Sequence, residues 1–234
     1  MISKELDKRI FTSLFLLILA FGMYKINIIL LCVLIIFGAL SIFEFNKVLK
    51  ILFLKRNRSK KKKILHFLVY LFSFIFYIFF TFISVYLLAT SDFILKIFLF
   101  YFLIICLLSD IGGFVFGNIF RGPKLTKISP KKTISGAIGS VLLVTIFSFS
   151  EIFFKLFTIE IKNIFFLTTI SIMTSILCQI GDLFFSFLKR KANIKDFGNI
   201  LPGHGGVLDR LDGILLGLPS AFLITILFDL LNLL

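Results

Sequence analysis

The stretch from Lys195 to Gly213 gathers residue types that bind phosphate and metal ions. It reads KDFGNILPGHGGVLDRLDG, with five glycines and three aspartates. Gly205 and Gly206 stand just before the last predicted helix, where flexible backbone can turn N–H groups toward an anion. His204, between them and Gly203, either contacts phosphate or makes a hydrogen bond within the loop. The stretch therefore predicts a loop that binds phosphate.

Carboxylates supply the second kind of chemistry. Asp209 and Asp212 are three residues apart at the start of the last predicted helix, so we expect them on one helix face. Together with Asp182 on a neighbouring predicted helix, they form an oxygen-ligand set suited to Mg²⁺. Cations that suit phosphate oxygens surround them: Lys189, Arg190, Lys195 and Arg210.

Asp110 and Asp182 lie in or at the ends of apolar stretches, beside Gly112, Gly113 and Gly181. An aspartate at the centre of a membrane-spanning helix costs about 2.5–3.5 kcal/mol, so such residues usually face a cavity or a partner. The glycines permit a close approach of a helix or a ligand. Asp182 has a second interpretation, a structural ion pair with a lysine of a loop.

The basic loop RGPKLTKISPKKTISG, residues 121–136, brings hydroxyl and ammonium groups to the start of another predicted helix. A bare basic loop would only orient the chain in a membrane. Donors this close to a helix start also suit a polyphosphate. The donors that we assign to substrate are Ser129, Lys131, Lys132 and Thr133.

The elements that must position these residues are apolar helices. Of 234 residues, 59% are hydrophobic, and the mean hydropathy is +1.08. Both values lie far above those of a soluble domain. A membrane-spanning helix needs about 20 apolar residues. The sequence predicts an all-α polytopic transmembrane bundle of about seven spans with a cytoplasmic N-terminus. The expected spans are 10–24, one starting at 28, 64–89, 93–116, 134–156, 164–185 and 214–233.

The net charge of +14 follows the topology and does not indicate nucleic acid. Most of the 26 lysines and arginines fall in four blocks, in alternate loops, as the positive-inside rule requires. Seven crossings place all four blocks in the cytoplasm. Cys32, Cys106 and Cys178 each lie in an apolar stretch without metal-ligand spacing and are predicted to be small buried side chains.

The motif from Ser186 through Lys189-Arg190 and Pro202-Gly203-His204-Gly205-Gly206 to Asp209-Arg210-Leu211-Asp212 closely resembles the C-terminal motif of the phosphatidate cytidylyltransferases. The resemblance extends upstream, through Asp110 with Gly117, the SPKKT segment with Gly136 and Gly139, and Gln179-x-Gly181-Asp182. It covers about residues 109–216. The N-terminal spans resemble those of the family only in general character, as two helices that end near Glu44.

The resemblance implies the reaction of CTP with phosphatidate to give CDP-diacylglycerol and pyrophosphate, in phospholipid biosynthesis. It implies a Mg²⁺ cofactor on Asp182 and Asp209. It divides the chain into N-terminal helices, 1–108, and a catalytic region, 109–234, with its site at the cytoplasmic face of the bacterial inner (cell) membrane. The catalytic set is Asp182, Asp209, Asp212, Lys189 and Arg210. The substrate set is Asp110, Ser129, Lys131, Lys132, Thr133, Arg190, His204, Gly205 and Gly206.

Two positions depart from the family's pattern. Many members carry glutamate where this chain has Ser135 and Phe185, so the full ligand set of the metal is open. Also open are a second, monovalent cation, a homodimer, the acyl-chain preference and the residues that read cytosine. Two other functions use similar residues: a CTP-dependent polyprenol or dolichol kinase, and a transporter. A transporter predicts a site at mid-membrane, whereas these acids cluster beside lysines at one face.

Overall fold

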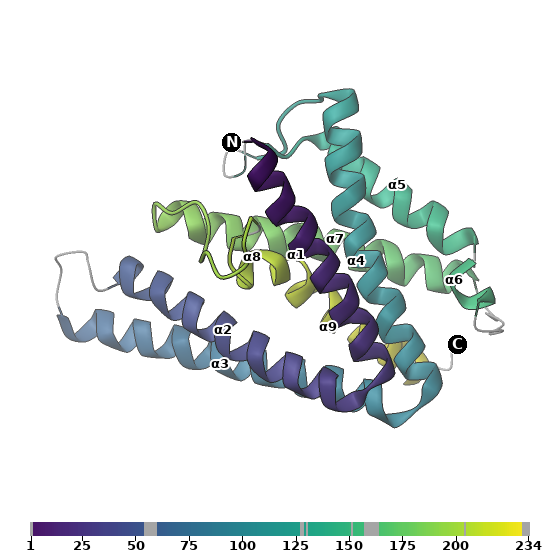
Figure 1. The fold of residues 1–234 in the computed structure, drawn as a ribbon, viewed down its shortest axis with the longest axis horizontal. Coiled ribbons are helices and arrows are strands. Elements are labelled where there is room, and N and C mark those ends of the chain that lie inside the picture. Colours follow the sequence, from purple (N-terminus) through teal and green to yellow (C-terminus); the bar gives the residue numbers. More distant parts are fainter. Residues whose placement is uncertain are drawn as a thin grey trace. The chain divides into compact units, whose positions relative to one another are not determined.

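The computed structural model describes residues 2–53, 60–126, 129, 131–150, 152–156, 164–203 and 205–230. Of residues 2–10, 60–62 and 224–230 it describes the backbone alone. The described chain is all-helical apart from short loops and two isolated β-bridges (Figure 1). The helices are α1 (Ile2–Lys25), α2 (Asn27–Phe53), α3 (Lys60–Ser91), α4 (Phe93–Phe120), α5 (Ile134–Ser150), α6 (Ile152–Lys155), α7 (Ile164–Lys191), α8 (Leu208–Leu211) and α9 (Ile214–Leu230).

Five segments within the described residues are long and apolar enough to cross a membrane. They are Asn27–Phe53, Lys63–Ser91, Phe93–Phe120, Ile134–Lys155 and Ile164–Lys191. Each matches a predicted span, so the all-α integral membrane class is confirmed. The first and last predicted spans also form helices, α1 and α9, and neither is among the five segments found in the described residues. The count of seven therefore stays a prediction.

The chain packs as two compact units. Unit 1 comprises Met1–Lys96 and Leu188–Leu211, and unit 2 comprises Ile97–Phe187 and Asp212–Leu234. Unit 1 thus combines the first three helices with the end of α7, the glycine-rich loop and α8. The division at residue 108, which concerns activity and not packing, stays a prediction.

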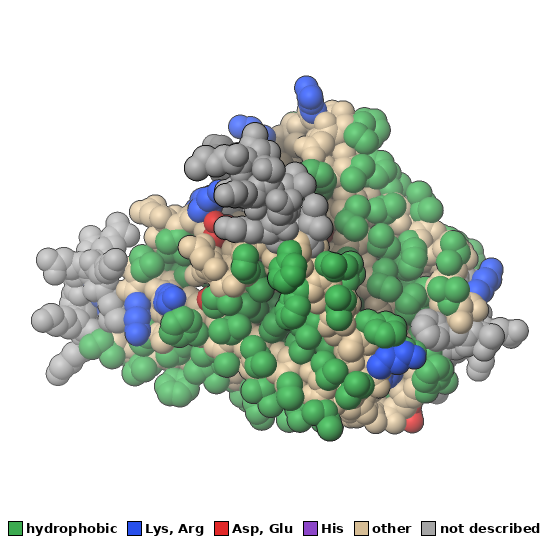
Figure 2. Space-filling model, viewed as in Figure 1, with side chains coloured by type: hydrophobic (Ala, Val, Ile, Leu, Met, Phe, Trp, Pro, Cys, Tyr) green, Lys and Arg blue, Asp and Glu red, His purple; other side chains and the backbone are tan. Residues whose placement is uncertain are grey.

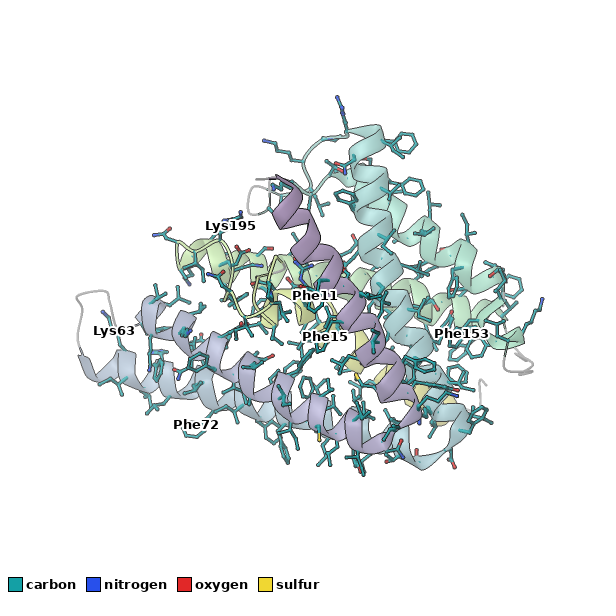
Figure 3. All side chains as sticks on the ribbon, in the orientation of Figure 1. Phe11, Phe15, Lys63, Phe72, Phe153 and Lys195 are labelled. Carbon is teal, nitrogen blue, oxygen red and sulfur yellow. The ribbon has the colours of Figure 1, made fainter. Side chains whose placement is uncertain are left out.

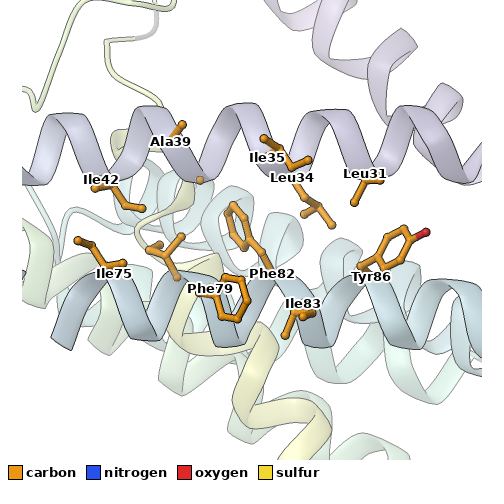
Figure 4. Close-up of a pocket in the computed structure, with 12 residues that line it drawn as sticks. Leu31, Leu34, Ile35, Ala39, Ile42, Ile75, Phe79, Phe82, Ile83 and Tyr86 are labelled. Carbon is orange, nitrogen blue, oxygen red and sulfur yellow. The ribbon is translucent and has the colours of Figure 1, made fainter. Parts of the chain in front are cut away.

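In unit 1, α2 and α3 pack side by side along most of their length (Figure 1). The rings of Phe45 and Phe74 stack with centroids 3.8 Å apart, and Gly38 allows Phe82 to approach α2 closely. Between the two helices lies an apolar pocket of about 390 Å³, whose lining includes Leu34, Phe79 and other aliphatic and aromatic side chains (Figure 4). Apolar packing of this kind needs no polar partner, which suits helices that cross a bilayer.

In unit 2, buried hydroxyl groups connect α4, α5 and α7. The Tyr101 hydroxyl donates to Ser148 Oγ at 3.0 Å and lies 2.8 Å from Ser171 Oγ. Nearer the other end of α4, Ser109 Oγ lies 2.8 Å from Ser175 Oγ, and Ser140 Oγ donates to the Ser109 carbonyl at 2.6 Å. Hydroxyl groups satisfied across helices replace the water that a bilayer lacks. These contacts fix the three helices against one another.

Glycines let α4 and α5 cross almost backbone to backbone. A Cβ atom added at Gly112 would lie 2.8 Å from the carbonyl oxygen of Gly139, and one at Gly136 would lie 2.6 Å from that of Gly113. Small residues at a membrane helix crossing allow this close packing. The glycines beside Asp110 therefore serve helix approach, one of the two roles predicted for them.

The cysteine prediction is correct for two residues and wrong for the third. Cys106 and Cys178 are buried, and their sulfur atoms lie 3.0 Å apart between α4 and α7. Cys32 is exposed, because it lies on a face of α2 that no other described helix covers. An apolar stretch of sequence does not distinguish a face that meets protein from one that meets lipid.

Large apolar side chains cover much of the visible face of the molecule (Figure 2). Phe11, Phe15 and Phe72 are each more than half exposed and extend away from their helices (Figure 3). On a soluble protein so much exposed apolar surface would cause aggregation. Here it is the surface expected of helices that contact acyl chains.

The glycine crossing predicts a change in stability. Gly112→Ala places a methyl group against backbone that cannot move aside, and overpacking of this kind costs about 1–3 kcal/mol. Gly22→Ala is the matched control, because its added Cβ atom would lie at an ordinary 3.4 Å from Ile29. We expect Gly112→Ala to lower the melting temperature in detergent, whereas Gly22→Ala leaves it unchanged or raises it through helix propensity. Equal melting temperatures for the two variants would contradict the close crossing.

Candidate functional site

A polar pocket of about 270 Å³ lies in unit 2 at one end of α4, α5 and α7. Asp110 comes from α4, Asp182 from α7, and Lys131 and Lys132 from the loop before α5. Its lining is Ser109, Asp110, Gly113, Phe114, Leu125, Lys131, Lys132, Thr133, Gly136, Ala137, Ser140, Gln179 and Asp182. The structure therefore brings together five predicted site residues that are up to 72 positions apart in sequence. Two acids face two lysines there.

Asp182 forms an ion pair with Lys132 across this pocket. The side chains keep 25% and 26% of their surface exposed, so solvent or a ligand can reach both. Ser186, one turn further along α7, donates to Asp182 Oδ1 at 3.3 Å. The ion pair with a loop lysine that the second interpretation of Asp182 predicts is present, and a role for Asp182 in binding metal stays a prediction. The pair is half-buried, and each partner keeps surface that a ligand can contact.

The loop between α4 and α5 forms a short hairpin that presents the two lysines. Lys124 and Thr133 form a β-bridge, and Leu125 N donates to the Lys132 carbonyl at 2.8 Å. Ser129 closes the turn, because its carbonyl oxygen accepts from Lys132 N at 3.0 Å. The sequence assigned Ser129 to substrate, and its observed contacts are those of the turn.

Thr133 is the N-cap of α5. Its hydroxyl accepts from Gly136 N at 3.1 Å, three residues along, which satisfies one of the free N–H groups at the helix start. Thr133 also lines the pocket, so a substrate role stays a prediction beside the capping role. Ser135, one of the two departures from the family's pattern, accepts from Gly122 N at 3.2 Å and ties the two ends of the loop together.

Asp212 does not share a helix with Asp209, contrary to the prediction from their spacing. α8 ends at Leu211 and α9 begins at Ile214, with a turn between them. Asp212 Oδ1 accepts from Gly213 N at 3.0 Å, a local bond by which a short acid competes with helix formation. The carbonyl of Asp212 also passes close to Gly181 of α7, where a Cβ atom would lie 2.7 Å away.

The other predicted residues belong to unit 1, where the last turn of α7 carries Lys189 and Arg190. The helix ends at Lys191, and Asn193 two residues later has a φ of 55°, a left-handed conformation that asparagine tolerates well. Arg190 is exposed, and its Nη1 lies 3.5 Å from the Ile194 carbonyl. Lys195 follows on the exposed segment after the helix (Figure 3).

Asp209 organises the glycine-rich loop of unit 1. Its Oδ1 accepts from Lys189 Nζ at 2.8 Å, and its Oδ2 accepts from the backbone N–H groups of Phe197 and Gly206 at 2.8 and 3.0 Å. Only 6% of the side chain is exposed. Lys189 Nζ also lies over the ring of Phe197, 5.3 Å from its centroid. The carboxylate therefore joins the end of α7, the middle of the loop and the start of α8.

The glycines permit the turns of this loop and its close contacts. Gly203 and Gly205 have φ angles of 74° and 85°, which disfavour other residues. Leu201 N donates to the Gly205 carbonyl at 2.8 Å and closes the turn. Glycine is required at position 206 for a different reason, because a Cβ atom there would lie 2.5 Å from Glu44 Oε1. His204, predicted to contact substrate, lies outside the described residues.

Glu44 contacts the glycine-rich loop of this region and is not among the site residues predicted from the sequence. This carboxylate of α2 has no exposed surface, and it accepts from the N–H groups of Val207 and Leu208 at 3.1 and 2.8 Å. The sequence contained a signal for Glu44, because placing a glutamate inside an apolar span costs free energy just as placing Asp110 or Asp182 there does. The predicted turning of N–H groups toward an anion is found, with the chain's own carboxylates as the anions. Substitution of Gly206 would thus disturb Glu44 as well as any phosphate.

The predicted metal ligands are distributed over the two units, with Asp182 in unit 2 and Asp209 in unit 1. Within the part of the chain that the structure describes, no group of three or more histidine, cysteine or acidic side chains is gathered in the manner of a metal site. Phe185, the second departure from the family's pattern, is a buried core residue of α7. Asp182 is partly exposed beside a pocket, and its oxygens have the chemistry that Mg²⁺ prefers.

Comparison with known proteins places this site in a family. The profile described as "Cytidylyltransferase family" matches residues 2–228. A Rickettsia felis protein named phosphatidate cytidylyltransferase is 45% identical over 128 residues, 52% of this chain and 56% of the relative. Proteins of the same name from Staphylococcus haemolyticus and Helicobacter pylori are 43% and 41% identical, over 48% and 49% of this chain and 42% of each relative. The chain thus spans about half the length of these relatives in the aligned parts. Because the family profile covers nearly all of the sequence, the chain belongs to the cytidylyltransferase family.

Proposed function

We propose that this protein transfers CMP from CTP to phosphatidate and releases pyrophosphate, giving CDP-diacylglycerol. The observation that carries the proposal is the pocket where Asp110 and Asp182 face Lys131 and Lys132 at one end of membrane-spanning helices. Acids and lysines together suit a substrate that brings several phosphate groups and a divalent ion. The family match and the names of the relatives support the same reaction.

The reaction requires little covalent chemistry from the protein. An oxygen of the lipid phosphate forms a bond to the α-phosphorus of CTP, and the bond from that phosphorus to the bridging oxygen of pyrophosphate breaks. The attacking phosphate is already an anion, so no general base is needed. Positioning and neutralisation of charge supply the catalysis. Lysines on a short hairpin and acids on rigid helices provide both.

The structure contains two lysine–aspartate pairs, Lys132 with Asp182 and Lys189 with Asp209. Each lysine can turn from its carboxylate to a phosphate oxygen when CTP enters, which frees a carboxylate oxygen. Asp182 would hold Mg²⁺. Asp209 is also assigned to Mg²⁺, because it lies in the C-terminal motif that resembles that of the family. The bound ion would neutralise charge on the phosphates. Arg190, Arg210 and Lys131 are further phosphate contacts, and Asp110 and Asp212 orient the ligands.

We place the site at the cytoplasmic face of the bacterial inner (cell) membrane, in a chain with seven crossings and an N-terminus in the cytoplasm. The support is the segregation of basic residues into alternate loops. CTP is a cytoplasmic metabolite, so a site on that face meets both the nucleotide and the lipid headgroup. A dimer and a second, monovalent ion remain part of the proposal without further support.

The first experiment separates CMP transfer from phosphate transfer. Purified protein is incubated with phosphatidate, MgCl₂ and CTP labelled on either the α- or the γ-phosphate. We expect label in the lipid only from α-labelled CTP, with pyrophosphate as the second product. A parallel incubation contains a polyprenol in place of phosphatidate, and label in the polyprenol only from γ-labelled CTP would establish the kinase instead. If neither α-labelled nor γ-labelled CTP transferred label to a lipid, the transporter would be the remaining candidate function.

The second experiment tests the acids. Asp182→Asn and Asp209→Asn each keep the side chain's shape and an acceptor oxygen but lose the charge. We expect turnover to fall at least about a hundredfold, as for the loss of a group that stabilises transition-state charge. Asp92→Asn, in the turn between α3 and α4, is the matched control and should keep full turnover. Retention of more than about a tenth of wild-type turnover, a change below about 1.4 kcal/mol, would remove that aspartate from the site.

The third experiment tests the topology. Single cysteines replace Asn193, which follows α7, and Asp92, in a Cys32→Ser background; the two remaining native cysteines are buried. Seven crossings place these positions on opposite faces of the membrane. A reagent that cannot cross the membrane should label position 92 in intact cells, and position 193 only after permeabilisation. Cysteines at Arg58 and Lys127, outside the described residues, should behave as position 193 does. Labelling of position 193 in intact cells would contradict the orientation.

A further inference from the structure

Glu44 is a charged side chain enclosed in the interior of unit 1. It lies in the candidate span Asn27–Phe53 and has no exposed surface. A buried carboxylate without partners is strongly unfavourable, so its hydrogen bonds must offset the loss of water. Its Oε1 accepts from Val207 N at 3.1 Å and its Oε2 accepts from Leu208 N at 2.8 Å. Both bonds reach a segment more than 160 residues further along the chain.

The loop is shaped to receive this carboxylate. A Cβ atom at Gly198 would overlap Glu44 Oε1, and one at Gly206 would lie within 2.6 Å of both carboxylate oxygens. Two glycines from different turns of the loop therefore contact one side chain. A second, weaker attachment comes from α1, where Thr12 Oγ1 donates to the Pro202 carbonyl at 2.8 Å.

Three consecutive N–H groups of the loop donate to carboxylates. Gly206 N donates to Asp209 Oδ2, and the next two donate to Glu44. One carboxylate comes from within the motif and the other comes from α2, so the backbone of residues 206–208 is held from both sides. Asp209 follows directly, with its own carboxylate nearly buried.

We propose that Glu44 is a positioning residue that holds the backbone of residues 206–208 and thereby fixes where Asp209 presents its carboxylate. The N-terminal helices would then contribute to the site through α2 and would be more than a membrane anchor. The kinetic part of this proposal rests on the proposed CMP transfer, whereas the structural part does not.

The structural part is tested by hydrogen–deuterium exchange of the whole protein in detergent. Glu44→Gln keeps the size of the side chain and one acceptor oxygen, and Glu44→Ala removes both acceptors. We expect the amides of Val207 and Leu208 to exchange at least about tenfold faster in Glu44→Ala, with a smaller effect in Glu44→Gln, as the loss of bonds to a charged group predicts. Amides of α3, such as those around Ile78, should be unchanged, which shows that the fold persists.

Ser41→Ala is the matched control. Ser41 lies on the same helix one turn away and is also fully buried, but its hydroxyl has no hydrogen-bond partner in the described part of the chain. We expect wild-type exchange at residues 207 and 208 in this variant. Protection that persists in both Glu44 variants, or is lost equally in Ser41→Ala, would overturn the proposal.

The kinetic part is tested by steady-state CMP transfer. If Glu44 positions Asp209, then kcat should fall at least about tenfold in Glu44→Gln, while KM for CTP changes less than about threefold. A merely structural residue would lower the melting temperature and leave kcat per folded molecule unchanged, and that result would overturn the positioning role. If wild-type protein transfers no CMP, the proposed reaction fails and the exchange rates alone decide whether Glu44 holds the loop.

Discussion

Polar groups on helices that cross a bilayer have no water to bind, so a partner inside the protein offsets the cost of burying them. The pairing of buried carboxylates with backbone N–H groups is the strongest form of this constraint here. Glu44 and Asp209 together accept four such bonds, and these bonds define the course of the loop from Phe197 to Leu208. The serines of α4, α5 and α7 satisfy the same requirement with neutral groups. Apolar packing brings the helices together, and polar pairing fixes their register.

The same constraint explains why the two aspartates assigned to Mg²⁺, Asp182 and Asp209, are paired with lysines. An isolated carboxylate near the apolar interior would be costly, and a lysine partner removes most of that cost. The pairs differ in exposure. Lys132 and Asp182 keep about a quarter of their surface, while Asp209 keeps 6%. Asp182 lines the pocket and is therefore open to a ligand there. Asp209 has a structural task as well, which its substitution would also disturb.

The glycines of this chain occupy their positions for several different physical reasons. Gly112 and Gly136 are small because two helices cross at backbone distance, whereas Gly203 and Gly205 adopt backbone angles that other residues resist. Gly206 is small because a buried carboxylate occupies the adjacent space. In sequence, the glycines near Asp110 predict close approach of a helix or a ligand, and those of the C-terminal loop predict room for a phosphate. Their separate roles come from neighbours that are distant along the chain.

The sequence by itself determined the class of protein and predicts the chemistry of its site. Apolar runs of helix length predict membrane helices, since the thickness of the bilayer sets that length. Aspartates beside glycines and lysines predict a phosphate and metal site, since few other groups serve that purpose. Tertiary structure decided the partners. It paired Asp182 with Lys132 and separated Asp212 from the helix of Asp209. It also enclosed Glu44 against residues 207 and 208. Such pairings depend on which helix faces meet, and one-dimensional periodicity in an almost uniformly apolar chain does not mark those faces.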